Sequence, residues 1–412
     1  MTTGEPLYAD EGAVQLQRTG RLAAYLAGRG MRVTWWTGRF DHRAKRQRRD
    51  LVDAEPNRVA IRLIDSPGYQ RNVSIQRIFD HRVFASNFLR DALRAERPDV
   101  IVASLPTVDG AYASIKAGQF HRCPTVVDVR DQWPDLMVEY LPPLLRPFGR
   151  AGLHVMDRQA RQALAQSTAI IGITEPYVAW ALEKARRQRR PLDRAFPISR
   201  EPASMANGQH TAGLRELAAA GIVADGSVAT VSFVGTLGKQ FDIASVIAAG
   251  AELRARHVPV RLVIAGDGEA RDGYVRAADG LPNVVFPGEI SRVGVGALLG
   301  LSIAGLAPYV DVRNFRDNVP NKIIEYLSAG LPILSPLSGE VASLIRTHEV
   351  GVSYAPGNAM ALADAIERLR RETPLRRAMS ENARRLFLDR YDADRVHASV
   401  AAYLDEVVSQ FQ

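Results

Sequence analysis

The chain has 412 residues, of which 46% are hydrophobic and 24% charged, and these globular values exclude a largely disordered chain. Its single cysteine, Cys123, excludes a disulfide framework and a multi-cysteine zinc or iron–sulfur site, and it fits a reducing compartment. The net charge of +8 is uneven: residues 1–200 carry 32 Lys and Arg against 21 Asp and Glu, whereas residues 201–412 carry 21 against 24, which suggests two modules with different partners.

Short apolar runs alternate with amphipathic stretches in the first half of the chain. The predicted strands are 32–37, 60–64, 100–103, 125–129 and 169–173. The predicted helices are 14–28, 78–95, 152–166 and 176–190. Strands that alternate with helices in this way indicate a parallel sheet with right-handed crossovers.

The second half repeats the alternation. Its predicted strands are 228–234, 261–265, 284–286, 303–307, 333–335 and 352–354, and its predicted helices are 243–256, 270–278, 321–329, 360–371 and about 393–411. We therefore predict two Rossmann-like domains, 1–200 and 201–390, with a final helical segment, 391–412, that packs back on the first domain. The boundary falls in the segment 191–227, which holds three prolines near its start.

One uncharged stretch reaches the minimum length of a membrane span. It covers 18 residues between Arg292 and Asp311, but it contains four glycines and Pro308. A helix end that runs into a buried strand, 303–307, is the better interpretation. The polar start of the chain has no signal peptide. We expect a soluble, cytoplasmic protein that is at most peripheral to a membrane.

The most informative segment is 317–330, DNVPNKIIEYLSAG, which opens a predicted helix. In parallel α/β sheets ligands bind beyond the carboxyl ends of the strands. A helix start there offers free N–H groups and a positive dipole end to a diphosphate, with Asn318 or Asn321 as a possible cap. Lys322 adds a cation. Glu325, one turn further on, can accept hydrogen bonds from both hydroxyls of a ribose.

This segment, followed by LPIL, resembles the donor-site motif of glycosyltransferase family 4, the retaining enzymes of the GT-B fold. That motif has two glutamates separated by seven residues. Glu325 matches the second, and Asp317 occupies the position of the first. The resemblance implies an α/β GT-B fold with two Rossmann-like domains that face a cleft. It also implies that Glu325 binds the donor ribose and that Asp317 faces the donor sugar.

Three more segments of the second half resemble strand ends of the same donor domain. They are 232–242 (SFVGTLGKQFD), 261–269 (RLVIAGDGE) and 283–290 (NVVFPGEI). The resemblance implies that Gly235 and Gly266 approach the donor, that Lys239 binds its phosphates, and that backbone groups near Gly288 hold the base. It adds Asn321 and Lys322 to the donor-binding residues. Many family members have an arginine where Thr236 stands here.

The first half resembles a narrower branch, the O-antigen transferases similar to N-acetyl-L-fucosaminyltransferase. The resemblance rests on DVRDQWPD at 128–135, TWWTGRFD with the following histidine at 34–42, and PGYQRNVSIQR at 67–77. Arg130 and Asp131 follow a strand end, so we predict both as catalytic residues together with Asp317. Asp131 would orient the acceptor hydroxyl, and Arg130 would help the helix start, Lys239 and Lys322 to stabilise the leaving diphosphate. No metal or other cofactor is expected.

The start of the chain departs from that family, whose members begin with a strand and then a Gly-rich loop. Here residues 4–12, GEPLYADEG, already resemble the loop, and Met1–Gly4 is too short and polar for the strand. A lost central strand would leave unpaired backbone groups. We therefore expect the true start to lie upstream of Met1, and Gly12 to be the close backbone approach to the donor.

These features predict a retaining glycosyltransferase of hexosyl or N-acetylhexosaminyl type. The resemblance implies a UDP-sugar donor and a saccharide acceptor in O-antigen, capsule or exopolysaccharide biosynthesis. Two alternatives stay open. A nucleotide-sugar 2-epimerase of the same fold would need no acceptor, and a non-catalytic scaffold would only recruit partners at the membrane. The sequence leaves the donor sugar, the acceptor, the linkage and the oligomeric state undecided.

Two basic clusters in the first half bear on the partner. Residues 39–49 and 184–194 each hold six Lys and Arg, and the segment 141–148, LPPLLRPF, places apolar side chains among prolines. This combination suits an anionic bilayer surface, where a lipid-linked saccharide acceptor would be presented. A solvated basic face is the alternative. Nucleic acid is disfavoured, because no recognised nucleic-acid-binding motif accompanies the charge.

Overall fold

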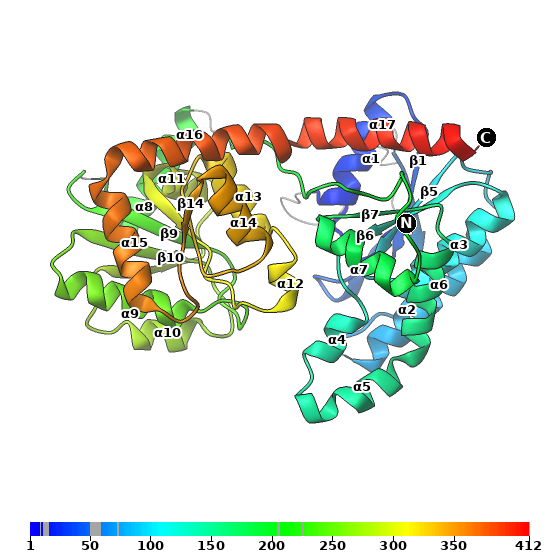
Figure 1. Cartoon of the computed structure of the whole chain (residues 1–412), viewed down its shortest axis with the longest axis horizontal. Helices are drawn as coiled ribbons and strands as arrows, with labels where there is room; N and C mark the ends of the chain where they lie inside the picture. Colours follow the sequence, from blue (N-terminus) through cyan, green and yellow to red (C-terminus); the bar gives the residue numbers. More distant parts are fainter. Residues whose placement is uncertain are drawn as a thin grey trace. The chain divides into compact units, whose positions relative to one another are not determined.

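The computed structural model describes residues 1–8, 10, 16–49, 59–71, 74–203, 207–224 and 226–411. The chain divides into two compact units (Figure 1). Unit 1 comprises Met1–Pro197 and Val396–Gln412, and unit 2 comprises Ile198–Arg395. Each unit contains a parallel sheet with helices packed against it, which is the predicted fold class.

Unit 1 contains a four-stranded parallel sheet in the order β5 (Ile101–Leu105), β6 (Thr125–Val129), β7 (Ala169–Gly172), β8 (Arg194–Ala195). A second parallel pair joins β1 (Val33–Gly38) to β4 (Val59–Ile64), and β2 (Phe40–Asp41) forms a hairpin with β3 (Arg46–Gln47). The helices are α1 (Arg18–Gly28), α2 (Ile75–Ala92), α3 (Val108–His121), α4 (Asp135–Glu139), α5 (Arg146–Gly152), α6 (His154–Gln166) and α7 (Glu175–Ala185), with a 3-10 turn η2 (Pro143–Leu145).

The first two residues connect the two parallel sheets of unit 1. The Met1 amine donates to the Val102 carbonyl at 2.6 Å, and the Ser104 N–H donates to the Met1 carbonyl at 3.0 Å. On the other side, the Thr2 N–H donates to the Trp36 carbonyl at 3.1 Å. Met1 and Thr2 thus lie between β5 and β1, although no strand is assigned to them. The expected upstream start of the chain stays a prediction.

Strand β6 explains why a parallel sheet forms in unit 1. All five of its residues, TVVDV, are buried, and such continuous burial is typical of a strand covered on both faces. The C-terminal helix α17 (Ala393–Phe411) supplies part of that cover, since Val400 and Val407 belong to the apolar cluster that holds Val126. The Tyr403 hydroxyl also donates to the Leu192 carbonyl at 2.9 Å.

Unit 2 contains one six-stranded parallel sheet. Its order is β11 (Val284–Gly288), β10 (Val260–Ala265), β9 (Ala229–Val234), β12 (Ser302–Leu306), β13 (Ile333–Ser335), β14 (Gly351–Ser353). Along the chain, β10 and β11 are added on one side of β9, and β12, β13 and β14 are then added on the other side. The boundary between β9 and β12 is therefore the topological switch point, where sheets of this kind bind ligands.

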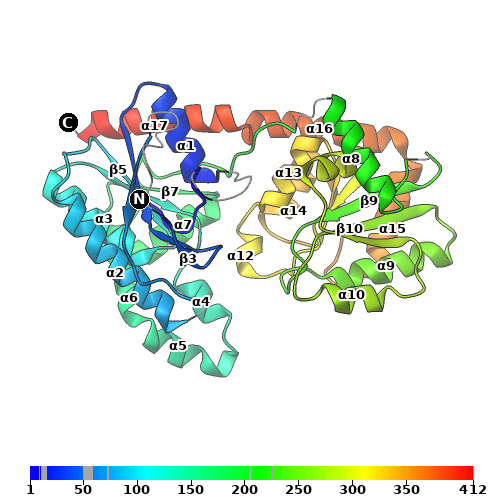
Figure 2. The ribbon, with the colours of Figure 1, turned by 180° about the vertical axis from the view of Figure 1, so that it is seen from behind.

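Helices flank the sheet of unit 2 (Figure 2). They are α8 (Asn207–Ala219), α9 (Ile243–Ala255), α10 (Arg271–Ala277), α11 (Arg292–Leu301), α12 (Arg313–Arg316), α13 (Asn321–Ala329), α14 (Glu340–His348), α15 (Ala359–Arg371) and α16 (Thr373–Arg390). The predicted helix 321–329 and the predicted strands 125–129 and 333–335 have the observed bounds. Among the helices of the described residues, sequence reasoning missed seven: α3, α4, α5, α8, α12, α14 and α16.

The uncharged stretch examined as a membrane span contains most of α11 and all of β12. This confirms the interpretation as a helix end followed by a strand. Within the described residues, none of the helices combines the length and the apolar character that crossing a bilayer requires.

Candidate functional site

Three predicted donor-site glycines lie together at the carboxyl ends of β9, β10 and β11. The Gly266 N–H donates to the Gly288 carbonyl at 2.7 Å, and the Gly235 N–H donates to the Ala265 carbonyl at 2.9 Å. Gly266 has a φ of +128°, and a Cβ atom on it would overlap the carbonyl oxygen of Gly235. Only glycine fits such a backbone-to-backbone contact, so the three turns form one closely packed edge of the sheet.

The Lys322 side chain reaches this edge from the first turn of α13. Its Nζ donates to the Val234 carbonyl at the end of β9 and lies 4.4 Å from the ring centroid of Phe233. A Cβ atom on Gly235 would lie 2.5 Å from the same Nζ. Burial lowers the pKa of Lys322 to about 8, against the opposing effect of the Glu325 carboxylate. A buried cation therefore lies beside the glycine turns.

Glu325 follows Lys322 by one helical turn and forms an ion pair that the sequence did not reveal. Its Oε1 accepts from Arg200 Nη2 at 2.6 Å, and the two side chains are 17% and 35% exposed. Arg200 is held by backbone bonds to the segment before α17: its N–H donates to the Tyr391 carbonyl, and its own carbonyl accepts from Ala393 N–H. No local motif marks Arg200, because its partners are distant in sequence.

The remaining predicted donor residues lie around the start of α13 and in the loop after β9. Asp317 Oδ2 lies 3.5 Å from Arg313 Nε. The prediction that Asn318 or Asn321 caps α13 is wrong: the N-cap position is Pro320, and no side chain caps the helix. The buried Oδ1 of Asn318 has no hydrogen-bond partner among the described residues. Asn321 and Lys239 are exposed.

Arg130 of unit 1 lies in a network of buried charges. Its Nε donates to Asp128 at 2.7 Å, its Nη2 donates to the Thr19 hydroxyl at 2.8 Å, and its Nη1 pairs with Glu5. Glu5 also accepts from the Thr19 N–H at the start of α1, and Arg18 donates to Asp128 at 3.1 Å. These contacts position the first loop and α1 against β6. A catalytic role for Arg130 stays a prediction.

Asp128 and Asp131 have opposite electrostatic environments, although only two residues separate them. Burial alone would raise the pKa of Asp128, but the Arg18 and Arg130 guanidinium groups hold it below its usual value. Burial raises the pKa of Asp131 to about 6, only partly offset by the Gln132 backbone N–H and the charge of Arg77. Asp131 is therefore a carboxyl group that can exchange a proton near neutral pH.

The structure thus brings together Gly235, Gly266, Gly288 and Lys322 at one sheet edge of unit 2, with Glu325 one turn along α13. Arg130 and Asp131 follow β6 of unit 1. Gly12 lies outside the described residues. Sequence reasoning missed the partners that hold these groups, Glu5, Arg18 and Arg200.

Both halves of the chain match known protein families. Residues 15–192 match the family described as glycosyl transferase 4-like domain, and residues 219–386 match the glycosyl transferases group 1. The crystal structure of Anabaena Alr3699/HepE in complex with UDP and glucose has a TM-score of 0.65 over 94% of this chain and 95% of that chain, at 15% identity. This similarity confirms the predicted two-domain GT-B fold.

Two characterised relatives show sequence similarity. The chain is 28% identical over 285 residues to the GDP-mannose-dependent alpha-mannosyltransferase of Mycobacterium tuberculosis (strain CDC 1551 / Oshkosh), covering 68% of this chain and 66% of that protein. It is 27% identical over 180 residues to the alpha-D-kanosaminyltransferase of Streptomyces kanamyceticus, covering 43% and 45%. The chain thus spans about two thirds of the first relative and less than half of the second. The narrower resemblance to O-antigen transferases stays a prediction.

Proposed function

We propose that this chain, whose two halves match glycosyltransferase families on a GT-B fold, moves a sugar from a nucleotide-sugar donor to a saccharide acceptor. The observation that carries the proposal is the edge of the unit 2 sheet at its switch point. There the start of α13 offers backbone N–H groups to a diphosphate, and Lys322 adds one buried cation beside the glycine turns. Glu325 lies at the distance of one turn, where a ribose would follow.

The charge at this edge suits the leaving group of glycosyl transfer. When the bond to the sugar breaks, negative charge develops on the departing diphosphate, and preorganised donors at low dielectric stabilise it. We assign this role to Lys322 and the α13 start, with Lys239 and Arg130 as further predicted contributors. Protein cations would then suffice for a metal-independent reaction. Asp317 would face the donor sugar.

Ribose binding by Glu325 would involve a carboxylate that is already paired with Arg200. Arg200 Nη2 already donates to one carboxylate oxygen of Glu325. A ribose diol would either share the carboxylate with Arg200 or displace it. We therefore assign Arg200 as a positioning residue that holds one oxygen of the Glu325 carboxylate.

We assign the acceptor side of the reaction to Asp131. A carboxylate that follows β6 and has a pKa of about 6 can orient the acceptor hydroxyl and polarise its O–H bond. By the family resemblance, the reaction retains the anomeric configuration, and the departing phosphate takes the proton. This mechanism uses one carboxylate of the protein for the acceptor and none as a nucleophile.

We propose UDP as the nucleotide of the donor. UDP occupies the solved structure of HepE, while the mycobacterial relative is GDP-mannose-dependent, so the two bases are the candidates to compare. The end of β11 at Gly288 and the loop that follows it would hold the base through backbone groups. The donor sugar itself is left open.

Thermal unfolding with each nucleotide tests the donor site. A ligand at a hundredfold excess over its Kd stabilises the folded state by about 2.7 kcal/mol. We expect UDP to raise the unfolding temperature of the wild type and of Glu381→Gln, an exposed control on α16, but not that of Glu325→Gln. A shift with GDP alone would reject UDP. No shift of the wild type with either nucleotide would reject the donor site.

We further propose that the acceptor is a lipid-linked precursor of a cell-surface polysaccharide, presented at an anionic membrane. The support is an apolar surface on η2 and α5, where Leu144 and Phe148 are 87% and 75% exposed. The basic cluster 184–194 gives less support, because Arg187, Arg189 and Arg194 pair with Asp193, Glu175 and Glu406.

Vesicle sedimentation tests the membrane proposal. The wild type should sediment with vesicles in which phosphatidylglycerol makes up about one third of the lipid. The Leu144→Ser/Phe148→Ser variant should not sediment with them. Val223→Ser, at an exposed apolar residue of unit 2, serves as the control. Equal sedimentation of the wild type and the double variant would contradict the role of this surface.

A further inference from the structure

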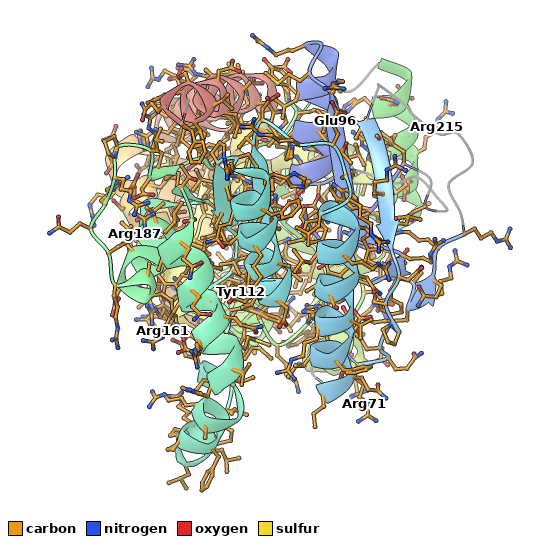
Figure 3. The ribbon with its side chains drawn as sticks, turned by 90° about the vertical axis from the view of Figure 1, so that its right-hand side faces the viewer. Arg71, Glu96, Tyr112, Arg161, Arg187 and Arg215 are labelled. Carbon is orange, nitrogen blue, oxygen red and sulfur yellow. The ribbon has the colours of Figure 1, made fainter. Side chains whose placement is uncertain are left out.

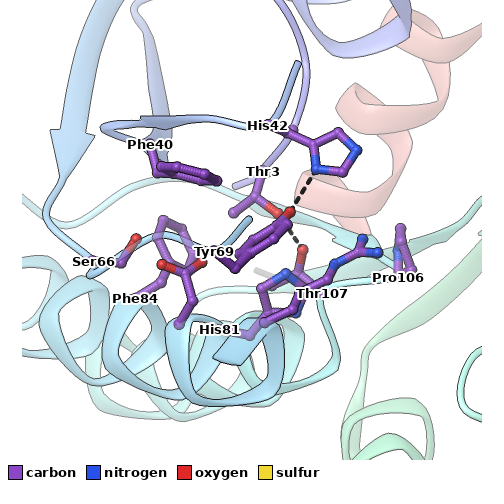
Figure 4. A pocket seen from close by; sticks show the side chains of 13 residues that line it. Thr3, Phe40, His42, Ser66, Tyr69, His81, Phe84, Pro106 and Thr107 are labelled. Atoms are coloured by element: carbon purple, nitrogen blue, oxygen red, sulfur yellow. Dashed lines mark hydrogen bonds between the residues drawn. The ribbon is translucent and has the colours of Figure 1, made fainter. Parts of the chain in front are cut away.

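Two motifs of the first half that the donor site leaves unused line one cavity in unit 1, and a third motif packs against one of the lining residues. The segment 34–42 contributes Phe40 and His42 to its wall, and the segment 67–77 contributes Tyr69 and Arg77 (Figure 4). From the segment 128–135, the Trp133 ring packs on Arg77, 4.6 Å from the guanidinium carbon. Segments that lie far apart in sequence thus build one small site.

Two cationic groups lie against the ring of Tyr69, which lines this cavity together with Arg77. The Arg77 guanidinium carbon lies 5.5 Å from the Tyr69 ring centroid, on a second aromatic face beside Trp133. Lys45 Nζ lies 4.6 Å from the same Tyr69 centroid. The Tyr69 hydroxyl is 2.6 Å from His42 Nδ1. Aromatic faces accept the C–H surface of a sugar ring, and an arginine held between rings keeps a fixed direction for binding an anion.

The two histidines of the cavity wall are uncharged, and Arg77 is the cation that lines it. Burial, followed by the charges of Lys45 and Arg77, lowers the pKa of His42 to about 4. Burial and the charge of Arg77 lower the pKa of His81 to about 3. Both imidazoles are therefore neutral at pH 7. The one carboxylate in the wall, Asp80, accepts from the Gly68 N–H at 2.7 Å and so holds the backbone of the cavity.

The size of the cavity selects a small ligand. Its volume is about 180 Å³, which corresponds to about six water molecules at about 30 Å³ each. That space suits one sugar ring or one anionic substituent, and it is too small for a nucleotide. The hydroxyls of Thr3 and Thr107 add polar groups at the rim and contact each other at 2.5 Å.

We propose that this cavity binds an anionic substituent of the acceptor sugar, a carboxylate or a phosphate, with Arg77 as its principal contact and Tyr69 as the stacking face for the ring. The inference rests on the proposed transferase function and names the class of acceptor. The Arg77 guanidinium packs on Trp133, which follows Asp131 by two residues, so an acceptor held by Arg77 would lie on the side of unit 1 that carries the carboxylate assigned to orient it.

Binding of simple sugars to the full chain tests the inference. The probes are glucuronate, glucose 1-phosphate, glucose and inorganic phosphate, each titrated by calorimetry. We expect at least one of the two anionic sugars to bind about tenfold or more tightly than glucose and inorganic phosphate, since a charged hydrogen bond contributes about 1.5–3 kcal/mol. Which one binds distinguishes a carboxylated from a phosphorylated acceptor.

Two variants assign the binding to the cavity. Arg77→Gln should abolish the preference for the anionic sugar. Arg71→Gln removes the same charge from an exposed residue near the start of α2 (Figure 3) and should keep it. Arg77→Lys retains the charge without the planar stacking group, and it should bind the anionic sugar more weakly than the wild type but more tightly than Arg77→Gln.

The outcomes that overturn the inference differ from those that overturn the proposed function. Equal binding of glucose and both anionic sugars, binding of inorganic phosphate as tight as that of either, or unchanged binding in Arg77→Gln would each reject the anionic acceptor site. The thermal shift with UDP reports the donor site separately. A UDP shift in Arg77→Gln equal to that of the wild type shows that the variant folds and that only the acceptor site has changed.

Discussion

The two units organise the carboxyl ends of their parallel strands in different ways. In unit 2, backbone packs on backbone, since Gly266 contacts Gly235 and Gly288 without any side chain between them. In unit 1, buried charges connect the segments, as Arg130 contacts Asp128 and Glu5. A close backbone contact requires a glycine, which can be recognised in the sequence because it follows a predicted strand. An ion-pair network requires only charged residues, whose spacing in the sequence is not fixed.

The network of buried charges has a second consequence for unit 1. Pairing lowers the pKa of Asp128, while burial raises that of Asp131. One strand end therefore holds a structural carboxylate and a titratable one. Separation of two carboxyl groups in this way is how a protein assigns them different roles. Unit 2 places one buried cation, Lys322, at the corresponding ends of its strands.

The largest expected effect comes from Asp131. Asp131→Asn should reduce the rate of sugar transfer by about 10²-fold, the upper end of what a hydrogen bond to a charged group contributes, because an amide accepts from the acceptor hydroxyl more weakly than a carboxylate. In the wild type, the active carboxylate disappears as the pH falls through about 6, so kcat/KM should drop about tenfold per pH unit below that value. At pH 8 the variant should unfold no earlier than the wild type, because the substitution removes a buried charge. A rate that stays constant from pH 7 to 5 would contradict this role.

The next effect tests the charge network of unit 1. Arg130→Met leaves Glu5 buried without its ion pair, and we expect the free energy of unfolding to fall by about 3–5 kcal/mol in denaturant titrations. The control is Arg189→Met. The Arg189–Glu175 side chains are 50% and 59% exposed, and exposed pairs contribute about 1 kcal/mol or less. Similar losses in both variants would show that burial does not set the strength of the network.

A smaller loss is expected from the glycine edge of unit 2. Gly266→Ala forces a non-glycine residue to a φ of +128° and places its Cβ against Gly235, so we expect a loss of about 2–4 kcal/mol. Gly273→Ala is the matched control. Gly273 lies within α10 with no heavy atom within 4 Å of the added Cβ, so alanine should be neutral or stabilising by up to about 1 kcal/mol. A neutral Gly266→Ala would refute the close contact.

The smallest effect should be the same in both units, because it depends on local structure alone. The Ser74 hydroxyl caps α2 in unit 1, and the Asn358 side chain caps α15 in unit 2. Replacement of either by alanine should cost about 1 kcal/mol in thermal or denaturant unfolding. Ser343→Ala, at an exposed position within α14, should change stability by less than about 0.5 kcal/mol. A clear difference between the two caps would show that the units respond differently even to local changes.

Elements with large apolar residues at regular spacing were predictable. Strand β6 and helix α13 have their predicted bounds because their apolar residues stand at the spacing of a buried strand and of a helix face. Helix α3 was missed for the opposite reason. Its buried face contains small residues such as Gly110, Ala111 and Gly118, and a Cβ on Gly118 would overlap the Thr125 side chain. Close packing requires small residues there, so α3 lacks the regular spacing of large apolar residues that identifies a helix in a sequence.

Local sequence patterns were sufficient to predict the alternating α/β architecture, the glycines at the ends of β9, β10 and β11, and the positions of Lys322 and Glu325 on one helix. All of these depend on residues close together in the chain, where spacing converts directly into geometry. The tertiary structure was needed to show that Arg200 pairs with Glu325, that Glu5 and Asp128 share Arg130, and that two separate motifs line one cavity. These contacts join residues separated by up to 125 positions, and a charged side chain can reach any partner that the fold brings near it.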